Sequence, residues 1–269
     1  MNRALLVGIN KYPSAPLGGC INDVSDVANF LVGKCGFVMS DVRLLTDERA
    51  TTAGIKERLG WLLTGLRAGD RVLFHYSGHG VQMPTRNPAG EVDGLDEAIC
   101  PVDFDWSDER AIRDKEFNKL FATVPEGVEF VWISDSCHSG DLSRAIPKTP
   151  HKHRTMNPPL DINWRLQTAK ENKKMRTITV VGSAANTNIA LIAACQSTQT
   201  AADAAFNNRP NGALSYFLLK ELQKPDGLKT PLTKAIENVA AALTQNGFEQ
   251  KPQVEGNKIL TQRGFLAVK

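Results

Sequence analysis

The sequence predicts an α/β protein with a mostly parallel central sheet and helices on both faces. Short apolar runs alternate along the chain with longer segments in which apolar residues recur at helical spacing. The short runs are mainly apolar and do not alternate regularly with polar residues, which is typical of parallel strands that are covered on both faces.

The expected elements follow from these patterns. Strands are expected at residues 4–9, 42–45, 71–76, 98–100, 129–134, 178–181 and 190–194. Helices are expected from 22 or 23 to about 31, from 51 or 52 to about 66, from 114 to 121, and near 212–223 and 231–245. Residues 141–176 have no regular pattern and contain four prolines, so we expect a long loop there.

We expect a single domain that covers residues 1–269. A chain of this length buries roughly 70–75% of its unfolded surface in one core, and no linker-like stretch divides it. Residues 1–140 and 177–269 would form its two parts, joined by the loop 141–176. Because the five cysteines contain no CxxC pair, we expect neither a disulfide framework nor structural zinc, and therefore a cytoplasmic location.

Charge is unevenly distributed along the chain. A formal net charge of +3 conceals eight acids and no base in residues 91–109, and nine bases against three acids in residues 141–176. Because the positive charge lies in a segment of little periodicity, we expect no nucleic-acid binding. No apolar run approaches the roughly 20 residues that span a bilayer, and the first residues do not have the pattern of a signal peptide.

Two motifs directly follow predicted strands, SGHG at residues 77–80 and DSCHSG at residues 135–140. Because sites in parallel sheets gather at the carboxyl ends of strands, we expect His79 and Cys137 to meet. A histidine can serve as general base for a cysteine nucleophile, and the amides of Gly80 and Cys137 are candidate oxyanion donors. The alternative is a buried thiol and a histidine in a glycine turn, but two motifs at strand ends argue against it.

The motifs resemble those of the metacaspases and bacterial orthocaspases, in the caspase-like clan of cysteine peptidases. They stand here as YSGHG and DSCHSG, and the likeness extends to LGGCIND at 17–23, DGLDE at 93–97 and PQVEG at 252–256. It covers nearly the whole chain, although the QAC sequence of true caspases is absent. The resemblance implies a caspase-like sandwich fold, cysteine endopeptidase activity, and His79 and Cys137 as the catalytic dyad.

Charge indicates which substrates are preferred. Side chains alternate along a strand, so Asp135 should point the same way as Cys137 and attract a cationic side chain. The resemblance adds Asp23, Cys20 and Ser77 as walls of the same pocket. Two carboxylates would select Arg or Lys before the cut and reject Asp. A helix cap remains an alternative role for Asp23, and a structural role remains one for Asp135.

No cofactor is needed for this chemistry, but the resemblance implies calcium as an activator. Clustered carboxylates suit this hard cation, and alignment of the motifs places Asp96 and Asp114 on ligand positions, with Asp141 as a further candidate. Lys115 stands where another acid is expected, and Arg144 falls near a further one. A solvated acidic loop is the alternative.

The basic loop 141–176 is expected to be cut by the enzyme itself. It begins four residues after Cys137, so the attack would be intramolecular and the effective concentration high. An uncut loop could also fill the acidic pocket and keep the enzyme silent, whereas a loop without any regulatory part is the alternative. The candidate processing sites are Arg144, Lys148, Arg154, Lys174 and Arg176.

Two other functions remain open. A cysteine phosphatase would explain the CHSG sequence at 137–140, but it needs Arg six residues after the cysteine, where Ser143 stands. A non-catalytic caspase-like scaffold is the second alternative, although such proteins usually lose the cysteine or the histidine. The expected partners are protein or peptide substrates with Arg or Lys before the cut, and a separate recruiting or regulatory protein.

Overall fold

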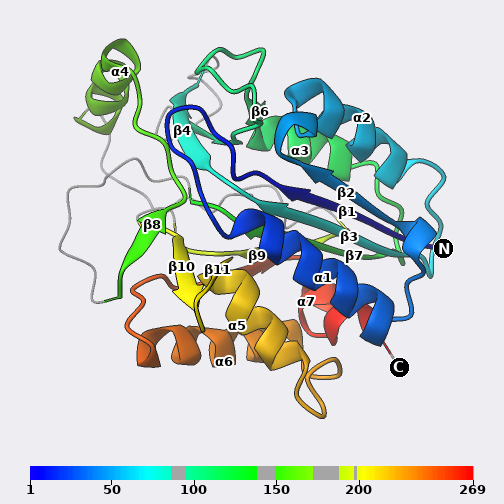
Figure 1. The fold of residues 1–269 in the computed structure, drawn as a ribbon. Helices are drawn as coiled ribbons and strands as arrows, with labels where there is room; N and C mark the ends of the chain where they lie inside the picture. Colours follow the sequence, from blue (N-terminus) through cyan, green and yellow to red (C-terminus); the bar gives the residue numbers. More distant parts are fainter. Residues whose placement is uncertain (86–94, 138–148, 172–187, 197–198, 269) are drawn as a thin grey trace.

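The central sheet has the strand order β12-β9-β7-β3-β1-β2 (Figure 1). The structure is a computed structural model, and it describes residues 1–85, 95–137, 149–171, 188–196 and 199–268. Neighbouring strands are parallel except at the β9–β12 pair, which is antiparallel. Its strands are β1 (Asn2–Gly8), β2 (Val42–Thr46), β3 (Arg71–Ser77), β7 (Glu129–Asp135), β9 (Ala190–Ala193) and β12 (Gln253–Gly256).

Helices cover both faces of this sheet, as predicted (Figure 1). One core contains Leu5 and Val7 of β1 together with side chains of α2 (Thr52–Leu63) and α3 (Asp114–Phe121). The other contains Ala4 and Leu6 of the same strand. It is covered by α1 (Cys20–Lys34), α5 (Ala213–Leu222), α6 (Leu232–Gln245) and α7 (Lys258–Thr261). Because both sides of β1 are buried, the apolar run in its sequence does not alternate.

The parallel register brings the two sequence motifs together. Gly8 of β1 pairs with Ser77 of β3, and Ser77 pairs with Asp135 of β7, so the three strands end side by side. The segments that contain His79 and Cys137 therefore leave the sheet at the same edge. This arrangement is the one expected from the sequence.

Two smaller sheets flank this edge. One has the order β4-β5-β6 and the other β11-β10-β8. The first consists of β4 (Gly80–Pro84), β5 (Leu95–Ile99) and β6 (Ile112–Arg113), and the second of β8 (His151–His153), β10 (Ala202–Phe206) and β11 (Arg209–Gly212).

The prediction of an irregular loop throughout residues 141–176 is wrong for two elements, β8 and α4 (Leu160–Glu171). The three-residue strand β8 obtains its backbone hydrogen bonds from β10 and has no apolar pattern of its own. The two prolines at 158–159 precede α4, where proline is tolerated because the first amides of a helix have no partner within it. The strand expected at 178–181 lies outside the described residues.

No helix in the described part of the chain has both the length and the apolar character needed to cross a membrane.

Candidate active site

His79 and Cys137 lie where the chain leaves β3 and β7, and both are buried. The Nε2 atom of His79 lies 2.7 Å from the carbonyl oxygen of Ala15, so we assign the ring proton to Nε2, which donates to that oxygen. Tyr12 packs against the ring and its hydroxyl accepts a hydrogen bond from the His79 amide. The His79 Nδ1 atom is buried without a hydrogen-bond partner within the described ranges, so it can accept a proton.

Burial keeps both groups neutral at pH 7. Desolvation raises the pKa of the Cys137 thiol to about 12, a change that a hydrogen bond with the Ala201 backbone and the nearby Arg154 guanidinium only partly offset. Desolvation also lowers the pKa of His79 to about 4, although its hydrogen bond to Ala15 acts in the opposite direction. The pair is therefore a thiol and a neutral imidazole in this state, and not a thiolate–imidazolium pair.

The two candidate oxyanion donors meet on one carbonyl oxygen. The backbone amides of Gly80 and Cys137 donate hydrogen bonds to the oxygen of Arg154, at 3.1 and 3.3 Å. These amides come from different motifs, and the parallel register of β3 and β7 brings them together. One peptide carbonyl of the chain itself thus accepts from both candidate oxyanion donors.

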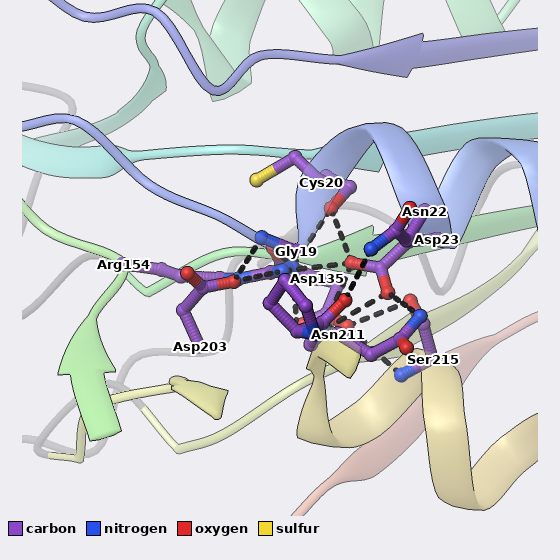
Figure 2. Close-up of polar contacts among 12 residues, drawn as sticks. Gly19, Cys20, Asn22, Asp23, Asp135, Arg154, Asp203, Asn211 and Ser215 are labelled. Atoms are coloured by element: carbon purple, nitrogen blue, oxygen red, sulfur yellow. Dashed lines mark hydrogen bonds and ion pairs between the residues drawn. The ribbon is translucent and has the colours of Figure 1, made fainter. Parts of the chain in front are cut away.

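The side chain of Arg154 enters a pocket formed by Asp23, Asp135, Asp203 and Ser77, which we call the acidic pocket. Figure 2 shows Arg154 reaching towards carboxylates that come from separate segments of the chain. Its guanidinium Nη2 lies 2.7 Å from an oxygen of Asp23 and 3.0 Å from one of Asp203. Its Nη1 lies 3.1 Å from Asp135 and donates to the Ser77 hydroxyl at 2.8 Å. Three carboxylates thus surround one fully buried cation.

Donors at the beginnings of α1 and α5 hold these carboxylates in place. Asp135 accepts from N and Oγ of Ser215, at 2.8 and 2.7 Å. Asp23 accepts from Gly212 N and Asn211 Nδ2, both at 2.9 Å. Asp203 accepts from Gly18 N and Gly19 N, at 2.7 and 2.9 Å. The positive ends of two helix dipoles therefore face the acidic pocket. Burial still raises the pKa of Asp135 to about 6, against the opposing effect of Arg154.

The pocket residues proposed from the sequence lie together, but the cap role considered for Asp23 is wrong. Gly19 is the N-cap of α1, and Asp23 lies inside the helix with its carboxylate in the acidic pocket. The helix begins earlier than expected because the Asp203 carboxylate accepts the Gly18 and Gly19 amides that precede it. Cys20 is buried at the first position of this helix, next to the pocket (Figure 2).

Three residues of this site were not anticipated: Asp203, Asn211 and Ser215. Asp203 contacts Arg154 directly, whereas Asn211 and Ser215 orient the other two carboxylates. One signal for Asp203 existed, because it is the single charged residue in the small and apolar stretch 201–206. Asn211 and Ser215 flank the beginning of a helix and are typical of such positions, so nothing in the sequence separates them from ordinary capping residues.

Strand β8 and the Arg154 that follows it run along β10. Strand β8 pairs antiparallel with β10, with His153 opposite Ala202 and Lys152 opposite Asp203. The Arg154 amide continues the pairing by donating to the Ala201 oxygen at 3.0 Å. Of the five candidate processing sites, Arg154 is the one that lies within the described residues. Arg144, Lys148, Lys174 and Arg176 lie outside them.

Basic side chains surround the first proposed calcium ligand. Asp96 accepts from Arg113 Nη1 at 2.7 Å and lies 2.8 Å from Lys115 Nζ. Asp114 accepts from the Lys115 amide at 2.7 Å, and Asp141 lies outside the described residues. No group of three or more metal-binding side chains occurs in the described part of the chain. These residues do not fit a divalent cation, because Asp96 already contacts two cationic groups.

The chain is similar to known proteins in sequence. Residues 2–145 match the family described as "Metacaspase, peptidase C14 domain". Metacaspase-1 of Meyerozyma guilliermondii is 28% identical over 95% of this chain and 69% of the relative. Metacaspase-1B of Neosartorya fischeri is 30% identical, with 94% of this chain and 68% of the relative covered.

Similarity to solved structures extends along nearly the whole chain. A protein of Geobacter sulfurreducens matches with a TM-score of 0.71 and 25% identity, covering 99% of this chain and 98% of that protein. Caspase-1 from Spodoptera frugiperda matches with a TM-score of 0.57 and 10% identity, covering 95% and 86%. The second match confirms the predicted caspase-like fold.

Proposed function

Because this chain belongs to the metacaspase family of cysteine-type peptidases, we propose that it is an endopeptidase in which Cys137 is the nucleophile and His79 the general base, and that it cuts proteins after Arg or Lys. The observation that supports this proposal is the position of Arg154. Its carbonyl oxygen accepts the Gly80 and Cys137 amides while its guanidinium lies in the acidic pocket. This is the arrangement that a substrate residue before the cut would need.

Neutral groups can begin the reaction without prior ionisation. As the Cys137 sulfur attacks the carbonyl carbon, the thiol proton passes to Nδ1 of His79, which is free to accept it because Nε2 donates to Ala15. A C–S bond forms, and the amides of Gly80 and Cys137 stabilise the oxyanion. The C–N bond then breaks and the imidazolium returns the proton to the leaving amine. Water hydrolyses the acyl-enzyme, with His79 again acting as base.

The acidic pocket favours a planar guanidinium. The two terminal nitrogens of Arg154 contact three carboxylates and one hydroxyl at 2.7–3.1 Å. A lysine ammonium has three donors on a single nitrogen and cannot make these contacts from two separate atoms. We therefore expect Arg to be preferred to Lys. An Asp side chain would add a fourth carboxylate to the same buried space, so it should be rejected.

The position of Arg154 also supports self-processing. The next bond along the chain, between Arg154 and Thr155, is the one that Cys137 would attack. We expect the cut at this bond. Until the segment leaves, it competes with external substrates for the acidic pocket, since Arg154 is completely buried there. The uncut chain is thus its own competitive inhibitor.

We place the enzyme in the cytoplasm, where its substrates would be proteins with exposed basic residues. The support is that all five cysteines are free thiols, as expected in a reducing compartment. Recruitment to these substrates by a separate partner protein remains part of the proposal. The family membership favours peptidase chemistry over the phosphatase alternative.

Fluorogenic peptides that end in Arg, Lys or Asp test this function. We expect the order Arg, then Lys, with no cleavage after Asp. Cys137→Ala should abolish turnover, whereas Cys35→Ala, which removes another buried thiol, should not. Asp135→Asn should lower kcat/KM for Arg peptides about 100-fold or more, because it removes one partner of a buried ion pair. If neither the wild type nor an Arg154→Ala chain cleaves any of these peptides, the scaffold alternative is correct.

A further inference from the structure

The segment before Arg154 presents two different faces. Lys152 and Arg154 alternate with His151 and His153 along the extended chain, so the basic and imidazole side chains point to opposite sides. The Lys152 ammonium donates to the carbonyl oxygen of Pro16 at 2.9 Å. The rings of His151 and His153 contact each other edge-to-face, with centroids 4.9 Å apart.

A cluster of aromatic rings lies on the imidazole side. The ring of His151 lies 5.9 Å from that of Phe248. Phe248 is buried and packs against Phe206 and Phe217, with centroids 5.7 and 6.2 Å away. The cluster is thus a fixed part of the core and is not formed by the segment itself. Aromatic contacts of this kind stabilise beyond the area they bury.

We propose that the enzyme recognises the three residues before the cleaved Arg or Lys as well, an inference that rests on the proposed function of the acidic pocket. Positions are counted backwards from the cut, so that Arg154 is the first and Lys152 the third. In this scheme the residue at the third position donates a hydrogen bond to the Pro16 carbonyl. The second and fourth are planar rings that pack together, and the fourth also contacts Phe248. The preferred substrate is a basic segment with alternating rings, bound as an extra strand on β10.

Each contact has a chemical reason for its preference. The Pro16 oxygen is a main-chain acceptor, so a Glu at the third position would offer no donor and would bring a negative charge close to a carbonyl oxygen. Across the strand pair, Lys152 lies opposite Asp203, which belongs to the acidic pocket. On the other side, burial lowers the pKa of His153, so the subsite favours an uncharged ring.

Four fluorogenic tetrapeptides test this scheme on the wild-type enzyme: His-Lys-His-Arg, His-Glu-His-Arg, Ala-Lys-Ala-Arg and His-Lys-His-Asp. A hydrogen bond to an exposed carbonyl contributes about 0.5–1.5 kcal/mol. The Lys-to-Glu change should therefore lower kcat/KM roughly 2–10-fold, and the ring-to-Ala changes should lower it by a similar factor. Equal rates for the three Arg peptides would overturn the extended recognition alone. Absence of cleavage of all the Arg peptides would instead refute the proposed function.

A Phe248→Leu variant separates ring recognition from general damage. It should raise KM for His-Lys-His-Arg several-fold and leave KM for Ala-Lys-Ala-Arg nearly unchanged, because only the first peptide has a ring that contacts Phe248. Equal changes for both peptides would contradict a role of Phe248 in recognition.

The basic residues around Asp96 carry a second and independent inference. Lys115 Nζ donates to the Thr85 hydroxyl at 2.9 Å besides contacting Asp96, and Arg113 contacts Asp108 as well as Asp96. We infer that these two side chains take the place of a divalent cation at Asp96. These two cationic side chains join Asp96 of β5 to the beginning of α3, and Lys115 also reaches Thr85, which follows β4. They neutralise the carboxylate that a cation would need, so the enzyme should work without calcium.

Calcium and magnesium titrations, measured by Tm and by hydrolysis of an Arg peptide, test this inference. Wild-type Tm and rate should not respond to calcium up to millimolar concentrations beyond the response to magnesium. In Lys115→Met, calcium should raise the Tm, because Asp96 has lost one of its cationic partners. The control Lys119→Met changes an exposed position of α3 and should behave as the wild type. A several-fold activation of the wild type by calcium would overturn the inference.

Discussion

Replacing Arg154 with Ala removes the cation from the acidic pocket and should destabilise the protein strongly. In the wild type its guanidinium lies 2.7, 3.0 and 3.1 Å from three buried carboxylates. Removal of one partner of a buried ion pair costs about 3–5 kcal/mol. For a chain of this size we therefore expect the Tm at pH 7.5 to fall by roughly 6–20 °C.

The loss should depend on pH in a defined direction. Asp135 has a pKa of about 6 in the folded wild type, raised by burial from an ordinary 3.8, and loss of the Arg154 cation should raise it further. Between the ordinary pKa of 3.8 and the raised pKa of the folded state, the folded variant holds a proton that the unfolded chain has released. Its stability falls as the pH rises through the folded pKa. The difference from the wild type should accordingly be smaller at pH 5 than at pH 7.5.

Thermal unfolding in a Cys137→Ala background, where the chain stays uncut, measures this effect. Arg154→Lys should lose less stability than Arg154→Ala because a cation remains, and Arg165→Ala, at an exposed position of α4, should lose almost none. Acetyl-arginine amide should raise the Tm of the Arg154→Ala chain only. A wild-type Tm for Arg154→Ala at pH 7.5, or a deficit that does not change with pH, would refute the reasoning.

Two further predictions follow from the same pocket. Gly212→Ala should abolish cleavage of Arg peptides, because a Cβ at this position would overlap Asp135 and Arg154. The control Gly33→Ala should be active, because its Cβ would meet no atom within 4 Å. Retained activity of Gly212→Ala would show that the substrate Arg binds in another pocket. Cleavage of Arg peptides should decline, mainly through a higher KM, as the pH falls through the pKa of Asp135, which burial raises to about 6; a KM independent of pH from 5 to 8 would contradict this.

The sequence predicted most of the sheet because buried parallel strands have a local signature. The run that became β3 contains the apolar stretch 72–74 and is buried from Val72 to Ser77, and the His79 motif follows it directly, so both the strand and its functional end could be recognised. The short strand β12 lacks this signature, because it lies at the sheet edge and its residues are only partly buried.

The parts of the site that escaped prediction depend on contacts between distant segments. Strand β8 exists because it pairs with β10, about 50 residues further along the chain. Asp203 joins the pocket through the same pairing and through the amides before α1, which no local pattern encodes. The early start of α1 has the same origin. By contrast, Asp135 could be predicted because it is the last residue of a buried strand, β7, and lies two residues before Cys137.

The bond that the enzyme cuts in its own chain tests the central proposal most directly. Mass spectrometry and N-terminal sequencing of the wild type and of Cys137→Ala, after incubation at neutral pH, should show one new N-terminus at Thr155 in the wild type and none in the variant. The account would be contradicted by equal cutting in Cys137→Ala. It would also be contradicted if the wild type remained a single chain while it hydrolysed Arg peptides.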